Sequence, residues 1–478
     1  MIKERTFLQY PPITLCIATL FAALAAAFFL PAPAADAGQP EGVRKGPLRL
    51  EDCLNIAFEN NLDLSQAKKG REEAALLLKQ AEGRRYPELN LGAMSGYMSD
   101  VNKMRIGDMT AEGPAGIGPL TIPGKNITIG EHEKADLFVT MLQPIYTGGK
   151  IEGGIRAASA GYDGSGHQLA LIRSQVRQQV VVAFHQVTKA RELKRIAVAG
   201  RKQIESHLKD AKNLMDQGMM LKSEMLPIDL RRLDMELKIV QAENAAARAT
   251  AALAERMGLP PGEPLDISTD PEPPPPWPIP DALASPPGAR PEQQIAEKQV
   301  EAAAGEADIA AAGLLPQVGL TASGHYGWPG YIATQPDWEP WWQTGVEMSW
   351  NVFDMDQRKN EKNAAMAKKS RLEQARTSVD QMIALDRINT RLTYGEACQK
   401  LLISKEKVAS AQENFHTKED NFKVGMATNT DFLDAHTELL NATSELALIS
   451  AEVQTAWADY LRAMGMEDYP MAISKETP

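Results

Sequence analysis

The chain has 478 residues, a formal net charge of −11 and a hydrophobic content of 44%. Its acidic balance argues against nucleic acid, or an anionic membrane surface, as the main partner. Its length allows two or three ordinary domains, or one elongated domain built by duplication.

The N-terminus is predicted to be an export signal. Lys3 and Arg5 precede a mostly apolar run over residues 13–30, and small residues follow it. This order is typical of a secretory signal peptide, so residues 1–37 are assigned to one, with cleavage at about residues 34–37. The run is long for a signal, and an uncleaved anchor helix is the alternative.

In the first half of the mature chain, helices and strands are predicted in a fixed order. Apolar residues recur at helical spacing over residues 50–81, where Asn60-Asn61 could interrupt the helix and leave a short piece before a longer one. Alternation predicts strands at 89–97 and 135–143. A long exposed loop, rich in Gly and Pro, joins these two strands. A heptad of small and apolar residues then predicts a coiled-coil helix at 150–217, which could approach about 100 Å, and a returning helix at 223–257.

The second half repeats this order. Gly218 and Gly425 each end a very long helix, and they lie 207 residues apart. The second copy is expected to contain a helix at 293–312, strands at 316–326 and 342–350, a helix at 354–424 and a returning helix at 430–464. The chain therefore divides into a first structural repeat at residues 38–258, a Pro-rich linker at 259–290, a second structural repeat at 291–465 and a C-terminal tail at 466–478.

The four strands come as two isolated pairs, and a lone hairpin is only marginally stable in water. In an exported chain, a closed barrel in an outer membrane would pair every strand edge. Aromatic residues near the strand ends fit the two interfacial belts of such a barrel, although the core of a soluble sheet is the alternative. The belt residues are Tyr146, Trp328, Trp341, Trp342, Trp350 and Phe353.

The duplicated order, the Gly-centred turns and the strand exit Gln143-Pro144-Ile145-Tyr146-Thr147-Gly148-Gly149-Lys150 together resemble the TolC family of outer membrane efflux proteins. The resemblance implies a mostly helical α+β membrane protein that forms a homotrimer. Each chain would give four strands to a twelve-stranded β-barrel, and its helices to a long antiparallel coiled-coil α-barrel in the periplasm. The trimer would be a passive exit duct for efflux or type I secretion, in contact with outer membrane lipid, a periplasmic adaptor and an inner-membrane transporter.

The resemblance also gives roles to residues at the helical turns. It implies that Asp431, Asp434 and Glu224 lie at the pore entrance, where rings of carboxylates favour cations. A helix N-cap role is the alternative for Asp431, because carboxylates are stabilised in a first turn. The adaptor-docking tips implied by the resemblance are Gly218, Met219, Gly425 and Met426.

Two positions depart from the pattern of relatives. Phe422 stands where relatives can have a tyrosine, and Ala427 where they can have an arginine. Phenylalanine cannot donate a hydrogen bond, and alanine cannot pair with a carboxylate. We therefore expect a closed entrance held mainly by packing and by the acidic rings, and controlled chiefly by the second turn.

Catalytic and metal-binding motifs are missing from the sequence. The seven histidines are scattered, and no HExxH, CxxC, G-x-S-x-G or phosphate loop occurs. We therefore expect no enzyme activity, no cofactor and no metal. The sequence favours an outer membrane channel that extends into the periplasm. The alternative is a periplasmic coiled-coil scaffold held by an uncleaved N-terminal helix.

Overall fold

A computed structural model gives the fold of residues 46–112, 118–129, 131–268, 275–279, 288–330 and 337–466. The predicted export signal lies outside these residues, as do parts of the linker and nearly all of the tail. Contacts divide the chain into two compact units, which do not coincide with the two sequence repeats. The strand unit contains Gly83–Gly148 and Ala312–Asp354, and the helical unit contains Lys45–Glu82, Gly149–Ala311 and Met355–Pro478.

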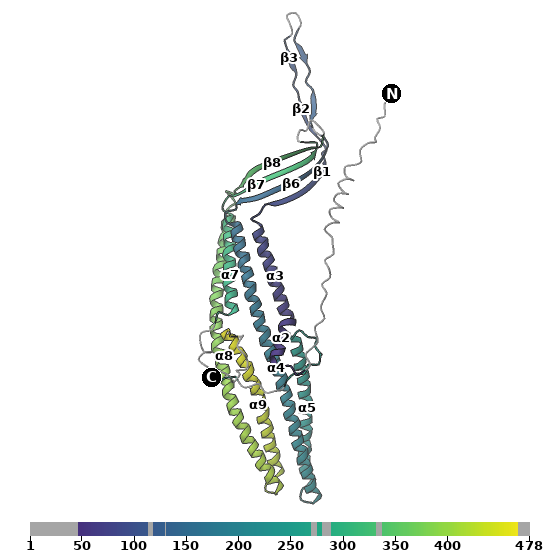
Figure 1. Ribbon diagram of the computed structural model, residues 1–478, viewed down its shortest axis with the longest axis vertical. Coiled ribbons are helices and arrows are strands. Elements are labelled where there is room, and N and C mark those ends of the chain that lie inside the picture. The colour runs from purple at the N-terminus through teal and green to yellow at the C-terminus, as the bar shows by residue number, and fades with distance from the viewer. Residues whose placement is uncertain are drawn as a thin grey trace, which may run out of the picture. The chain divides into compact units, whose positions relative to one another are not determined.

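The strand unit is built on one antiparallel sheet of four strands. These strands are β1 (Glu88–Tyr97), β6 (Glu133–Tyr146), β7 (Gln317–Trp328) and β8 (Glu339–Ser349). Their order is β1-β6-β7-β8, so the hairpin of each half of the chain pairs with the other through β6 and β7 (Figure 1). Because side chains alternate along a strand, this register fixes which residues share a face.

The two faces of the sheet differ in chemistry. Leu91 pairs with Val139 on a mainly apolar face, where Trp342 is also found. Within the described residues this apolar face is uncovered, since Leu91 is 71% exposed and Trp342 is 78% exposed. The opposite face is mainly polar and carries Asp136, Ser323 and other hydrogen-bonding side chains. A soluble sheet would bury its apolar face, so this pattern favours contact with lipid.

The segment between β1 and β6 is more regular than the sequence indicated. It forms two short antiparallel pairs, β2 (Asn102–Arg105) with β5 (Asn126–Ile129) and β3 (Met109–Ala111) with β4 (Leu120–Ile122). The segment is exposed, as predicted, but the prediction that it is a loop was wrong for these residues. Pairing between the two sides of this segment, as between Met104 and Ile127, creates the strands. The many Gly and Pro residues interrupt any alternation of apolar residues, so the sequence pattern did not indicate that pairing.

The helical unit contains two long antiparallel hairpins. The first joins α4 to α5, and the second joins α8 to α9, while α4 also contacts α9 (Figure 1). None of the described helices has the length and apolar content needed to cross a membrane. The helix bounds are α2 Leu50–Asn60, α3 Leu62–Gly83, α4 Lys150–Asp216, α5 Lys222–Arg256, α7 Pro291–Ala312, α8 Gln357–Lys423 and α9 Asn429–Met464.

The apolar core of the helical unit forms separate clusters along the hairpins. One cluster surrounds Cys53, Val180 and Leu253, and another surrounds Trp457 and Tyr394. The predicted heptad of α4 does face the core. Ala183 is partly buried against it, and the other helical members of the series, Val176, Ala190, Ala197, Ile204 and Ala211, are buried. The predicted fold class, mostly helical with a few antiparallel strands, is confirmed.

Candidate functional site

The two hairpin turns share one backbone geometry. Gly218 and Gly425 have φ angles of 75° and 77°, the left-handed region that favours glycine. The amide of Met219 donates to the Leu214 carbonyl at 2.9 Å, as expected for a helix end closed by a left-handed glycine. Met219 is 70% exposed and Met426 is 77% exposed. All four predicted tip residues therefore lie in the turns, and both methionines face solvent.

Asp431 lies in the first turn of α9, where its carboxylate is already engaged. The Thr428 hydroxyl donates to Asp431 Oδ2 at 2.7 Å, and the Thr428 amide donates to the same oxygen at 3.0 Å. Thr428 Oγ1 also accepts from the Asp431 amide at 3.1 Å. Lys418 Nζ also donates to Asp431 Oδ1 at 3.2 Å. These contacts, chiefly those of Thr428, lower the pKa of Asp431 to about 2. Asp431 is therefore the N3 residue of a capping box whose N-cap is Thr428, rather than the N-cap itself.

The other two predicted entrance carboxylates occupy different environments. Glu224 is the first-copy counterpart of Asp431, because it accepts from the Leu221 amide at 3.0 Å, but the Leu221 side chain cannot accept a bond in return, so α5 has only half of a capping box. Asp434 lies one turn further along α9 and is exposed. Glu224 and Asp431 both accept hydrogen bonds from the backbone at the start of their helices, whereas Asp434 lies beyond the first turn of α9.

A polar bridge, which the sequence did not reveal, joins the two hairpins near their turns. His207 Nε2 of α4 lies 2.8 Å from Asn429 Oδ1, at the start of α9. Asn429 Nδ2 in turn donates to the Glu224 carbonyl of α5 at 2.8 Å. Since this assigns Oδ1 as the acceptor, His207 Nε2 carries the proton. No sequence signal could identify this pair, because 222 residues separate His207 from Asn429.

Aromatic packing surrounds the bridge. The His207 ring stacks on Phe432, with centroids 3.6 Å apart and planes 11° apart, and lies 4.5 Å from the Phe422 ring. Phe422 is buried, so the position where relatives can have a tyrosine serves here as packing. His436 lies two turns after Asn429 along α9 and is 2% exposed. Burial lowers the pKa of His436 to about 4, and the pKa of His207 is also lowered, mainly by burial.

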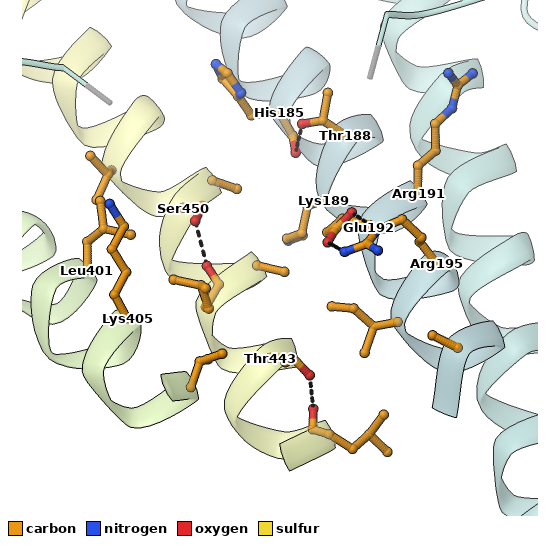
Figure 2. A pocket seen from close by; sticks show the side chains of 18 of the residues that line it. His185, Thr188, Lys189, Arg191, Glu192, Arg195, Leu401, Lys405, Thr443 and Ser450 are labelled. Atoms are coloured by element: carbon orange, nitrogen blue, oxygen red, sulfur yellow. Dashed lines mark hydrogen bonds and ion pairs between the residues drawn. The ribbon is translucent and has the colours of Figure 1, made fainter. Parts of the chain in front are cut away.

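A groove of about 990 Å³ lies between α4, α8 and α9 (Figure 2). Its wall is mostly apolar or neutral, but its charged residues are mainly basic, since Lys189, Arg191, Arg195 and Lys405 stand against Glu192. Glu192 accepts from Arg195 at 2.6 Å, which neutralises one of these charges. The hydroxyl of Thr443 donates to the Leu439 carbonyl of its own helix, so it is not directed at a ligand. The groove therefore offers positive charge rather than a catalytic arrangement.

The predicted belt aromatics lie at both ends of the sheet. Trp328, Trp341 and Trp342 lie near one end of β7 and β8, while Tyr146, Trp350 and Phe353 lie near the other. The last three are 47%, 51% and 80% exposed. Trp341 and Trp342 are neighbours in a strand, so they lie on opposite faces and only Trp342 shares the apolar face.

Comparison with known proteins agrees with this architecture. The chain is similar in fold to the outer-membrane channel OprN, with 18% identity, a TM-score of 0.71, and 87% of this chain and 89% of that chain covered. It is similar to the outer membrane protein VceC of Vibrio cholerae, with 15% identity, a TM-score of 0.70, and 87% and 96% covered. It is also similar to the open state of the MtrE outer membrane channel of Neisseria gonorrhoeae, with 17% identity, a TM-score of 0.68, and 90% and 91% covered.

None of the curated proteins matches the sequence. The profile of the outer membrane efflux protein family matches residues 53–259 and 288–466, which is most of the chain. The family and the fold are those of channels rather than enzymes, and they place the chain in the outer membrane. The chain belongs to the outer membrane efflux protein family, the TolC family of channels.

Proposed function

We propose that this chain forms the exit duct of a tripartite efflux or type I secretion system. Three copies would each give four strands to a twelve-stranded barrel and two hairpins to a periplasmic α-barrel. The duct would be passive and would work with a periplasmic adaptor and an inner-membrane transporter. The observation that best supports this proposal is the four-stranded sheet, which has one exposed apolar face and one polar face.

The edges of the sheet support closure by other copies. In the order β1-β6-β7-β8, strands β1 and β8 each have one neighbour within the described residues. Unpaired strand edges are not tolerated in a bilayer, because their backbone groups would lack hydrogen-bond partners. Pairing β8 of one copy with β1 of the next would close a barrel, with the apolar face toward lipid and the polar face toward water.

An exposed apolar stripe on α5 supports packing of the helices against another copy. Its members recur at alternating spacings of four and three, which is the seam of a coiled coil. Each is 48–65% exposed, so none is covered by the described part of the same chain. The stripe consists of Leu226, Leu230, Leu233, Leu237 and Val240.

The hairpin turns would form the periplasmic entrance. The exposed tips around Met219 and Met426 would meet the adaptor, and Asp434 would supply the main acidic ring. Asp431 would act mainly through its capping box, and Glu224 through its bond from the Leu221 amide. The bridge from His207 to Asn429 would hold the two hairpins of each subunit together in the closed state. This polar link adds to the packing that the sequence predicted.

We propose the domain boundaries on the same grounds. The structure has a helix, a strand hairpin and a long helical hairpin in each half, in the same order. Residues 38–258 and 291–465 would be two copies of one structural repeat, joined by the linker at 259–290. Residues 1–37 would be removed on export. Residues 466–478 would form the C-terminal tail.

The duct is tested with full-length protein extracted from outer membranes in detergent. Chemical cross-linking should give a trimer, and the trimer should conduct ions in planar lipid bilayers. A monomer that fractionates with the inner membrane and does not conduct would contradict the duct and favour the scaffold.

The entrance is tested with Asn429→Ala, which removes the link between hairpins. The matched control is Asn414→Ala, because Asn414 bonds to Glu438 within the second hairpin alone, at 3.1 Å. We expect a higher open fraction in single-channel records for Asn429→Ala and no change for the control. Asp434→Ala should lower cation selectivity. Equal records for both asparagine variants would contradict the proposed role of the bridge.

A further inference from the structure

Three side chains on the polar face of the sheet form a continuous chain of hydrogen bonds. His325 Nδ1 lies 2.8 Å from Asp136 Oδ2, and His325 Nε2 lies 3.1 Å from Ser323 Oγ. Ser323 and His325 are two residues apart on β7, so they share a face. Asp136 pairs with Gly327 in the sheet register, which places its carboxylate diagonally beside the imidazole.

The chemistry of the three groups sets the positions of their protons. An ionised carboxylate only accepts hydrogen bonds, so Nδ1 of His325 carries a proton toward Asp136. In the neutral ring, Nε2 is then the acceptor, and the Ser323 hydroxyl must donate to it. This is the arrangement of nucleophile, general base and orienting acid that activates a serine. The distance of 3.1 Å between Ser323 Oγ and Nε2 is within the range required for proton transfer.

Packing holds the imidazole in this orientation. The His325 ring stacks on Trp341, with centroids 3.8 Å apart and planes 1° apart, and lies 5.9 Å from the Phe138 ring. The side chains of His325 and Asp136 are only 14% and 23% exposed. A carboxylate shielded from water interacts more strongly with the imidazole that it orients. The ring therefore stays directed at Ser323.

Ser323 is flanked on each neighbouring strand by one residue whose side chain can donate a hydrogen bond. The register places Thr140 of β6 directly opposite Ser323, and Gln343 of β8 opposite it on the other side. Facing residues of antiparallel strands have Cβ atoms about 4.5–5.5 Å apart. The register therefore puts a hydroxyl-bearing residue and an amide-bearing residue on the two strands that flank Ser323, and these are the candidate donors to an oxyanion that forms on a group bound to Ser323.

We propose that Ser323, His325 and Asp136 form an acyl-transfer site that acts on small uncharged carboxylic esters. Ser323 Oγ attacks the ester carbonyl carbon while its proton passes to His325 Nε2. The bond to the alcohol oxygen then breaks, and the alcohol leaves with that proton. Water, deprotonated by the same nitrogen, attacks the acyl-serine, releases the carboxylic acid and restores the hydroxyl.

The surroundings define which esters could reach the site. Glu339 and Glu347 share the polar face with Asp136, so anionic esters would be repelled. Access from water rests on the proposed function, in which the polar face lines the lumen. The motif search could not reveal this site, because 189 residues separate Asp136 from His325.

The test uses the full-length protein in detergent and a fluorophosphonate probe, with peptide mass spectrometry to locate the label. We expect one label for each chain, at Ser323, and no label at this peptide in Ser323→Ala. Ser349→Ala is the matched control, since Ser349 lies on the same face of β8, opposite Gln317. His325→Gln should slow labelling by at least about 100-fold, the usual contribution of a general base.

A second measurement follows turnover of p-nitrophenyl acetate, which should be lost in Ser323→Ala and retained in Ser349→Ala. The proposal is overturned if Ser323 is not labelled, if His325→Gln leaves the labelling rate unchanged, or if ester turnover survives in Ser323→Ala. Conductance in planar bilayers reports separately on the duct, and Ser323→Ala should leave it unchanged. A wild-type protein that is labelled but never conducts would contradict the proposed duct and not the acyl-transfer site.

Discussion

His436 should make the helical unit sensitive to acid. Its ring is buried where α4, α8 and α9 meet, 5.9 Å from the Phe415 ring, and a Cβ atom added to Gly200 would lie 3.6 Å from its Nε2. Burial is the main cause of its lowered pKa, and Arg231, Lys238 and His207 lower it further, whereas a hydrogen bond with the Gly200 backbone opposes the shift. In the described part of the chain, Nε2 has no hydrogen-bond partner. Protonation would therefore place a charge in this packing that the Gly200 backbone compensates only in part.

The size of the effect follows from linkage. The pKa of His436 falls from 6.5 to about 4 on folding, which corresponds to roughly 3 kcal/mol at about 1.36 kcal/mol for each pKa unit. Because the unfolded state binds more protons between these two values, the free energy of unfolding falls as the pH drops below 6.5. The loss is complete below about pH 4. His185, whose pKa is also lowered to about 4 by burial, should add a similar slope.

The assay is urea unfolding of the full-length protein in detergent, followed by circular dichroism at pH 7, 6, 5 and 4. His436→Leu should lose about 3 kcal/mol less than the wild type between pH 7 and 4, since leucine cannot take up a proton. His416→Gln is the control, because the side chain of His416 is 58% exposed on α8. If His436→Leu and the wild type lose equal stability over this range, burial of a neutral His436 is not the source of the acid sensitivity.

Two further predictions concern glycines. Gly425→Ala should destabilise the second turn by about 1–2 kcal/mol in the same unfolding assay, because a left-handed φ of 77° crowds a Cβ atom. The control is Gly161→Ala within α4, where nothing lies within 4 Å of an added Cβ. Gly395→Leu should release the part of the linker at Pro276 and Trp277, because a Cβ on residue 395 would lie 3.0 Å from the Trp277 ring. The neighbouring Tyr394 holds the same segment by donating from Oη to the Pro276 carbonyl. Limited proteolysis should then cut near Trp277 faster than in the wild type, and an unchanged rate would contradict this anchoring role.

Local periodicity was enough to predict most elements of the fold. The heptad of α4, the left-handed glycines of both turns and the alternation along β6 are properties of short windows, so the sequence alone determines them. The sequence also indicated that Asn60-Asn61 could interrupt the helix over residues 50–81, and the structure confirms this. Asn61 ends α2, and its side chain donates to the Arg256 carbonyl at 2.9 Å. The interruption depends on a contact with a distant helix.

Tertiary structure alone decided how the two halves of the chain meet. The pairing of β6 with β7, the bridge between His207 and Asn429, and the alignment of Asp136 with His325 all join residues that lie far apart in sequence. Such contacts leave no periodic signal, because each depends on a single register or a single helix crossing. The sequence therefore determined the channel family and its repeated elements. Only the folded chain showed which side chains join the hairpins and which share the polar face of the sheet.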